Sequence, residues 1–161
     1  MNSNQRAFLE TPIGFVEIDC TGKGIRRLEF INFKVRIKRT PACLKECKDQ
    51  LRKYFKGERK EFSVPLDLEG TPFQLLVWNE LLQIPYGTTI TYLELARRIG
   101  DVKALRAVGG ANANNPLSIL IPCHRVIGMD GKLVGYGGGL WRKKWLLEHE
   151  YAFAQRDLFY V

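Results

Sequence analysis

The spacing of the apolar residues changes at Glu69-Gly70-Thr71-Pro72, and this change limits the folds open to the chain. Before it, apolar and polar residues alternate over 14–18, a Gly-containing turn follows, and 25–33 is rich in apolar residues, which is typical of a β-hairpin. After it, the apolar residues recur at helical spacing. The pattern predicts an α+β protein with an N-terminal α/β lobe over 1–71 and a mostly helical C-terminal domain over 72–161.

The rest of the N-terminal lobe is expected to hold one more strand and one helix. Residues 34–39 alternate cations with β-branched side chains, which favours an exposed edge strand whose charges discourage aggregation; DNA contact is the alternative. Apolar residues at helical spacing over 43–55, followed by Gly57, predict an amphipathic helix packed on a small antiparallel sheet.

The C-terminal domain is expected to contain a helix-turn-helix. Thr71 and Pro72 predict a first helix, because a Thr cap followed by Pro is a common helix start. Thr91 caps a second helix, and after Gly100-Asp101 a third runs to Ala113. A last helix is expected from 141 to 150.

The third helix of this domain is almost bare, in the sense that most of its side chains are those of Ala and Gly. It contains Gly109 and Gly110 among several alanines, and each interior glycine costs about 1 kcal/mol relative to Ala. Something must therefore approach this helix closely. Tight packing of another helix and contact with a nucleic-acid backbone both remain open.

The positive charge of the chain is compatible with an acidic partner, and the absence of a signal or membrane span favours an intracellular protein. The 25 Lys and Arg against 17 Asp and Glu leave a net charge of +8, which is compatible with nucleic-acid binding. No apolar run reaches the roughly 18 residues of a membrane span, and the first residues lack a secretory signal. The cysteines are expected to be free thiols, and no His precedes His124, so we expect no metal site.

The chemistry of the chain centres on Pro122-Cys123-His124-Arg125-Val126, which an apolar strand over 117–121 is expected to deliver. A free thiol of pKa near 8.5 is only about 3% ionised at pH 7, so a nucleophilic Cys needs neighbours that favour the anion, such as His124 or Arg125. The glycine-rich loop over 135–139 lacks the lysine of a nucleotide-binding P-loop. Such a loop can lie against a flat ligand.

Together these motifs resemble the O6-alkylguanine-DNA alkyltransferase family. The resemblance rests on the Cys-His-Arg motif, the upstream run 106–111 with Asn115-Pro116, the glycine-rich loop and the run 145–150, and it is strong over 72–150. It implies a ribonuclease H-like N-terminal lobe and a C-terminal domain in which a helix-turn-helix accompanies the active-site Cys.

The resemblance also implies a single-turnover methyltransferase. Cys123 would take an alkyl group from guanine O6 as a thioether that is not hydrolysed. His124 would pass the thiol proton through a water to a system ending in Glu150. Asn115 would tie the recognition helix to the active-site turn, and Tyr92 would rotate the target phosphate and donate a hydrogen bond to the purine.

DNA contacts follow from the same resemblance. Arg106 would enter the duplex where the flipped base was, while a bare helix sits in the minor groove; the residues expected at DNA are Tyr92, Arg106, Ala107, Gly110, Ala111 and Arg125. The substrate pocket would be formed by Val126, Tyr136, Gly137 and Lys143. The carbonyls of Cys123 and Val126 would accept from the guanine amino group, and the Gly137 N–H would donate to O6.

The expected partner is double-stranded DNA that contains alkylated guanine, with O4-alkylthymine as a further substrate. The protein would act as a monomer in the cytoplasm, or in the nucleus of a eukaryote, without membrane, metal or cofactor. Three alternatives remain: a non-catalytic alkyltransferase-like lesion sensor, a helix-turn-helix regulator with an incidental thiol, and a Cys-His hydrolase that turns over.

Overall fold

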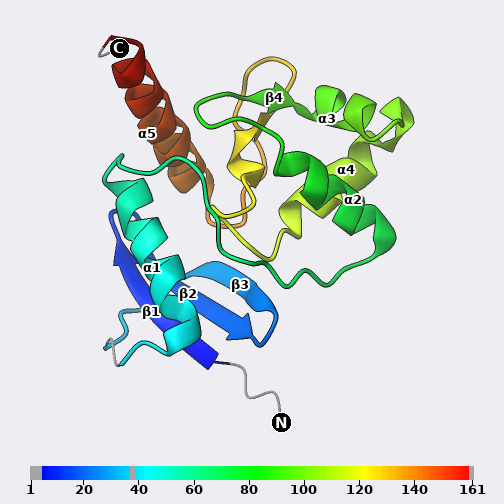
Figure 1. Cartoon of the computed structure of the whole chain (residues 1–161). Helices are drawn as coiled ribbons and strands as arrows, with labels where there is room; N and C mark the ends of the chain where they lie inside the picture. The colour runs from blue at the N-terminus through cyan, green and yellow to red at the C-terminus, as the bar shows by residue number, and fades with distance from the viewer. Residues whose placement is uncertain (1–4, 37–38, 160–161) are drawn as a thin grey trace. The chain divides into compact units, whose positions relative to one another are not determined.

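The chain folds into two compact units. The computed structural model describes residues 5–36 and 39–159 (Figure 1). The first unit comprises Met1–Glu69 with Pro116–Leu120, and the second comprises Gly70–Asn115 with Ile121–Val161. Together they hold a three-stranded antiparallel sheet, two short parallel strands and five α-helices within the described residues, so the fold is α+β as predicted.

The first unit is a sheet with a helix on one face. Strands β1 (Gln5–Thr11), β2 (Gly14–Thr21) and β3 (Gly24–Ile31) lie in the order β1-β2-β3, and β2 with β3 confirms the predicted hairpin. Alternate strand residues are buried, and α1 (Ala42–Phe55) covers them, as Figure 1 shows. The core formed this way contains Ala7, Leu9, Val16, Ile18, Leu28, Leu44, Cys47 and Leu51.

Two predictions for this unit are wrong. Residues 34–36 form no strand, and positions 37 and 38 of the expected edge strand lie outside the described residues. The cysteines are not all free, because Cys20 of β2 and Cys43 of α1 form a disulfide. The two are 23 residues apart in the chain, and only the packing of α1 on the sheet brings their sulfur atoms together. Cys47 and Cys123 are free.

The second unit contains the predicted helix-turn-helix. Helix α2 (Pro72–Leu81) begins with a capping box between Thr71 and Gln74, and α3 (Tyr92–Arg98) is capped by the Thr91 hydroxyl. Gly100, with φ of 88°, makes the turn into the 3-10 helix η1 (Val102–Ala104) and then α4 (Leu105–Ala113). The three helices lie beside one another in Figure 1.

The remaining elements of this unit carry the chemistry. The 3-10 helix η2 (Cys123–Arg125) leads into β5 (Val126–Ile127), which pairs in parallel with β4 (Ile90–Thr91). Helix α5 (Leu140–Phe159) continues nine residues beyond the predicted end at Glu150, because no Gly or Pro follows to stop it.

The strand expected over 117–121 is absent. The segment makes one isolated bridge, between Leu117 and Leu28, and then turns, with Ile119 at a φ of 73°. A β-branched residue rarely adopts this left-handed conformation, so apolar content alone could not predict the turn. No helix in the described ranges is long and apolar enough to cross a membrane.

Candidate active site

Cys123 lies on η2 and is almost fully buried, with 5% of its surface exposed. Its backbone N–H donates to the Ile121 carbonyl at 2.8 Å, which fixes the turn after Pro122. Burial raises the pKa of the Cys123 thiol, while a hydrogen bond from Asn115 and the charge of Lys143 act in the opposite direction. The resting sulfur is therefore a thiol, and nucleophilic attack requires a base to take its proton.

His124 directly follows this cysteine in the chain and forms a buried pair with Glu150. His124 Nε2 lies 2.7 Å from Glu150 Oε1, and neither side chain is more than 1% exposed. Arg125 holds the same carboxylate with two hydrogen bonds, from Nε to Oε2 and from Nη2 to Oε1, each of 2.8 Å. Burial would raise the pKa of Glu150, but His124 and Arg125 together hold it well below its usual range.

This charge pattern fixes the tautomer of the imidazole. An ionised carboxylate can only accept, so the His124 Nε2 atom carries the hydrogen in the 2.7 Å bond. Arg125 already balances the charge of Glu150, and burial lowers the pKa of His124, so the imidazole is neutral at pH 7. Its Nδ1 atom is then a free base, buried and without a hydrogen-bond partner among the described residues.

Arg125 is not a DNA contact, contrary to the prediction. It is only 7% exposed, and its remaining Nη1 group donates to the Ile84 carbonyl at 2.7 Å. The guanidinium is used entirely inside the unit, because it compensates the buried carboxylate of Glu150. Its place beside His124 in the sequence gave no sign of this role.

Asn115 and Tyr92 each make a hydrogen bond to the backbone of another segment of this unit. Asn115 Nδ2 donates to the Ile121 carbonyl at 2.8 Å, which ties the end of α4 to the turn that precedes Cys123. The Tyr92 hydroxyl, at the start of α3, donates to the Val134 carbonyl at 3.2 Å. Burial raises the pKa of Tyr92, so its hydroxyl keeps its hydrogen.

Lys143 links β5 to the start of the glycine-rich loop. It is fully buried, and its Nζ donates to the carbonyls of Val126 at 2.5 Å, Val134 at 2.8 Å and Gly135 at 3.4 Å. Burial lowers its pKa to about 8. Its ammonium therefore joins β5 to the entrance of the glycine-rich loop, and the Val126 carbonyl already has one donor.

The second part of the glycine-rich loop is held by two hydrogen bonds. Gly139 N–H donates to the Tyr136 carbonyl at 2.9 Å, and Arg142 Nη1 donates to the Gly138 carbonyl at 2.8 Å. Gly137 between them is exposed, and a Cβ there would meet nothing within 4 Å. The loop is ordered by these bonds and still leaves the Gly137 backbone open.

The exposed face of α4 carries three of the six residues expected at DNA. Arg106, Ala107 and Gly110 are exposed, and a Cβ on Gly110 would meet nothing within 4 Å. The same holds for Gly109, so helix packing within the described chain does not explain the bare surface. Ala111 is an exception: it is 4% exposed and faces α2, where its carbonyl accepts from Trp78 Nε1 at 2.9 Å. It is not a DNA contact.

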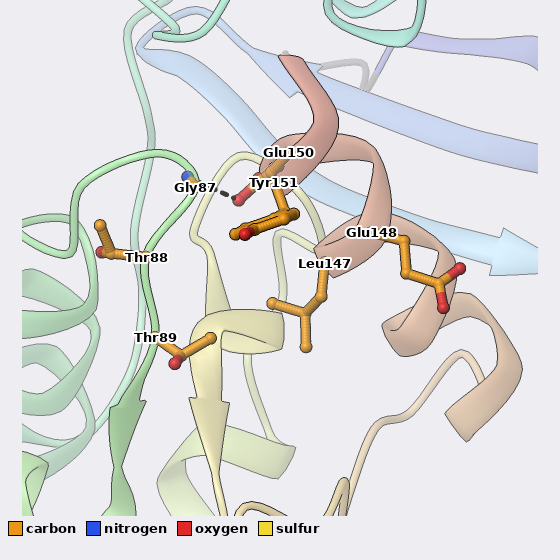
Figure 2. A pocket seen from close by; sticks show the side chains of 7 residues that line it. All are labelled: Gly87, Thr88, Thr89, Leu147, Glu148, Glu150 and Tyr151. Carbon is orange, nitrogen blue, oxygen red and sulfur yellow. Dashed lines mark hydrogen bonds between the residues drawn. The ribbon is translucent and has the colours of Figure 1, made fainter. Parts of the chain in front are cut away.

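A separate pocket of about 450 Å³ has Glu150 among its lining residues. It is formed by the loop Gly87–Thr89 and by α5, with Leu147 and Tyr151 among its lining residues, and Cys123 is not part of it. Figure 2 shows the Gly87 N–H directed at Glu150, to which it donates at 3.3 Å. Sequence reasoning missed this donor, as it missed Ile84, because a backbone group leaves no signal in the residue pattern.

The fold and the site define a class. A helix-turn-helix with a bare exposed helix stands beside a buried cysteine, a free imidazole nitrogen and an ionised glutamate, which is the arrangement of a DNA-binding protein with a nucleophilic thiol. Among the described residues, no three His, Cys, Asp or Glu side chains gather as metal ligands would.

Comparison with known proteins identifies the family. Residues 72–152 match "6-O-methylguanine DNA methyltransferase, DNA binding domain", and residues 5–68 match "6-O-methylguanine DNA methyltransferase, ribonuclease-like domain". The chain belongs to the 6-O-methylguanine DNA methyltransferase family, as the motifs predicted.

Relatives of similar length share nearly half of the sequence. The methylated-DNA–protein-cysteine methyltransferase of Mycobacterium bovis is 47% identical over 93% of this chain and 94% of its own length. The corresponding protein of Methanosarcina acetivorans is 46% identical over 89% of this chain and 96% of its own length. The crystal structure of Mycobacterium tuberculosis O6-methylguanine methyltransferase matches with a TM-score of 0.86 and 43% sequence identity, covering 98% of this chain and 99% of that one. The DNA complex of the same organism's protein matches with a TM-score of 0.83 and 47% identity, covering 91% of this chain and 92% of that one.

Proposed function

We propose that this protein repairs DNA by transferring the alkyl group of O6-alkylguanine to the sulfur of Cys123, once per molecule. The observation that carries the proposal is the free Nδ1 of His124, whose Nε2 is held by ionised Glu150, in the residue that directly follows a buried thiol in need of a base. Family membership supports the same reaction.

The chemical step follows from these groups. The Cys123 thiol gives its proton through a water to His124 Nδ1, and Glu150 stabilises the imidazolium that forms. The thiolate attacks the alkyl carbon, a carbon–sulfur bond forms, and the carbon–oxygen bond breaks with its electron pair going to the guanine. The Tyr92 hydroxyl stabilises the departing base by donating a hydrogen bond to the purine. The thioether has no route to hydrolysis.

The exposed face of α4 is the proposed DNA contact. Its small residues Ala107 and Gly110 let the helix enter the minor groove, which carries little sequence information, and Arg106 takes the place of the extruded base. The base then lies against Tyr136 and the open Gly137 backbone. Its amino group donates to the carbonyls of Cys123 and Val126, the latter accepting from Lys143 as well.

This proposal places the chemistry and the DNA contact in residues 72–161, with 1–71 as the supporting lobe. O4-alkylthymine is a second substrate, because its alkyl–oxygen bond presents the same electrophilic carbon. The protein acts as a monomer in the cytoplasm, or in the nucleus of a eukaryote, where its DNA partner is.

The test is intact mass and peptide mapping after incubation with a duplex that contains O6-methylguanine. We expect one added methylene, confined to the Cys123 peptide and never exceeding one per molecule. Cys47→Ser, which removes the other free buried thiol, should react normally, and Cys123→Ser should not react. No mass change with retained lesion binding would indicate a sensor, and turnover of a simple ester would indicate a hydrolase.

A further inference from the structure

Asn112 is a buried amide beside the reactive cysteine whose side chain has no role in the mechanism above. It is 3% exposed and lies on the inner face of α4, one helical turn after the buried Val108. The outer face of the same helix carries Arg106 and Gly110. Asn112 is thus the polar side chain through which the proposed DNA-reading helix meets the reaction centre.

The Asn112 amide nitrogen faces two groups that the proposed function directs at the purine. Nδ2 lies 3.4 Å from the Tyr92 hydroxyl oxygen and 3.5 Å from the Cys123 carbonyl oxygen. Both contacts are long, as catalytic hydrogen bonds often are before substrate binds. One amide is therefore placed to hold the hydroxyl and the carbonyl at a fixed spacing.

The direction of these bonds matters. Because an amide NH₂ can only donate, the Tyr92 oxygen accepts from Asn112 and its single hydrogen must be donated elsewhere. In this structure that hydrogen goes to the exposed Val134, whose carbonyl lies 3.2 Å away. A hydroxyl that accepts from one side is a better donor on the other, since hydrogen bonds in a chain polarise one another.

The side-chain oxygen of Asn112 makes neither of these two contacts. Asn112 Oδ1 is buried and has no hydrogen-bond partner within the described ranges of the chain. Buried polar atoms are nearly always paired in folded proteins, and exceptions are concentrated where function requires them. An unpaired acceptor next to Tyr92 and Cys123 indicates that Asn112 is kept for the site and not for packing.

We propose that Asn112 is a positioning residue of the alkyl transfer: its amide donor fixes the Tyr92 hydroxyl as a hydrogen-bond donor to the purine and holds the Cys123 carbonyl beside it. The inference rests on the proposed function, because it acts through the Tyr92–purine bond. It adds a connection between α4 and the leaving group that neither Arg106 nor Asn115 provides.

Single-turnover rates with two free bases test this role. We propose the ring nitrogen N3 as the purine atom that accepts from Tyr92; O6-benzylguanine has this nitrogen, and its 3-deaza analogue has a C–H there. We expect Asn112→Ala to slow the reaction with O6-benzylguanine about tenfold, the worth of one hydrogen bond of about 1.4 kcal/mol. The same variant should react with the 3-deaza analogue at nearly the wild-type rate for that analogue.

A second variant tests the direction of the bond. Asn112→Asp keeps the shape and replaces the donor with an acceptor, so the Tyr92 hydrogen would be drawn to the carboxylate and away from the purine. We expect a larger loss with O6-benzylguanine than for Asn112→Ala. Asn114→Ala is the matched control, because Asn114 is exposed, lies at the end of the same helix and has a side chain that donates to the Gly110 carbonyl.

The outcomes separate this inference from the proposed function. If the wild-type protein leaves Cys123 unmodified both by O6-methylguanine in a duplex and by O6-benzylguanine, the proposed function itself fails. If the wild-type protein reacts and the Asn112 variants lose the same factor with both bases, the residue is merely structural and the inference is overturned. Thermal unfolding of each variant, compared with Asn114→Ala, shows whether an equal loss comes from unfolding.

Discussion

Glu150 Oε1 lies 2.7 Å from His124 Nε2, and the two side chains are buried together although 26 residues separate them in the chain. The same carboxylate binds Arg125 through both of its oxygens. Removing it would leave a buried guanidinium without a counter-charge and an imidazole without its orienting acceptor. Glu150 therefore compensates the buried charge of Arg125 and orients His124, the base of the proposed transfer.

Replacing Glu150 with Gln tests both roles. We expect Glu150→Gln to lower the free energy of unfolding by about 3–5 kcal/mol, as breaking a buried ion pair does. Alkyl transfer should slow as well, measured as single-turnover rate on folded protein. Glu148→Gln is the control, since that side chain is 68% exposed on the same helix. Equal stability of the two variants would contradict the buried pair.

The depressed pKa of Glu150 predicts how stability depends on pH. A folded-state pKa below the unfolded value, which is about 4.3, means that the unfolded chain binds the proton first as pH falls. The contribution of this group is present above that pH and is lost progressively below it. Urea unfolding of the wild type between about pH 6 and pH 3 should show a steeper loss than Glu150→Gln. Parallel curves would refute the assignment.

The disulfide predicts a redox-dependent stability of the first unit. Cys20 and Cys43 close a loop of 23 residues, for which the chain-entropy model gives about 3 kcal/mol. Reductant should lower the melting temperature of the wild type and leave that of a Cys20→Ser/Cys43→Ser double variant unchanged. Thiol titration of the unfolded, unreduced protein should find only Cys47 and Cys123. Four titrating thiols would contradict the bond.

Elements with local signals were predictable from the sequence. Thr71 with Gln74 forms the expected cap of α2, Thr91 caps α3, and Gly100 makes the turn of the helix-turn-helix, because each signal acts within a few residues. Cys123 and His124 could be named from one motif. The resemblance predicted that Glu150 acts with His124, and in the structure the two side chains form a buried pair.

What the sequence could not supply depends on contacts between distant segments. Arg125 is a cation in a DNA-binding protein, and only the approach of α5 shows that it belongs to Glu150 and not to a phosphate. Asn112 lies in a helix that composition describes as bare, and its inward direction follows from the packing of α4. The Cys20–Cys43 bond and the turn at Ile119 require tertiary structure for the same reason.

The open surface at Gly110 predicts that a larger side chain there raises stability and weakens DNA binding. A Cβ at this exposed helical position meets nothing within 4 Å, so Gly110→Ala should stabilise the protein by up to about 1 kcal/mol. The added methyl group would project from the face that we propose enters the minor groove, so the affinity for duplex DNA should fall. Thermal unfolding and a DNA titration at fixed salt measure the two effects. Greater stability with unchanged affinity would show that the bare face does not approach DNA.

Arg106 separates the DNA step from the chemical step. It is exposed at the start of α4, whereas Asn112 of the same helix is buried, and we propose that it occupies the space of the flipped base. Arg106→Ala should therefore slow repair of O6-methylguanine in a duplex at least tenfold, since holding a base out of the stack is worth a few kcal/mol. The same variant should react with free O6-benzylguanine at the wild-type rate, because a free base needs no extrusion. Lys103→Ala, which removes a neighbouring exposed cation, controls for the general loss of phosphate attraction and should weaken DNA binding without this selectivity. An equal loss on duplex and free base would place Arg106 in the chemistry and refute its role as a base substitute.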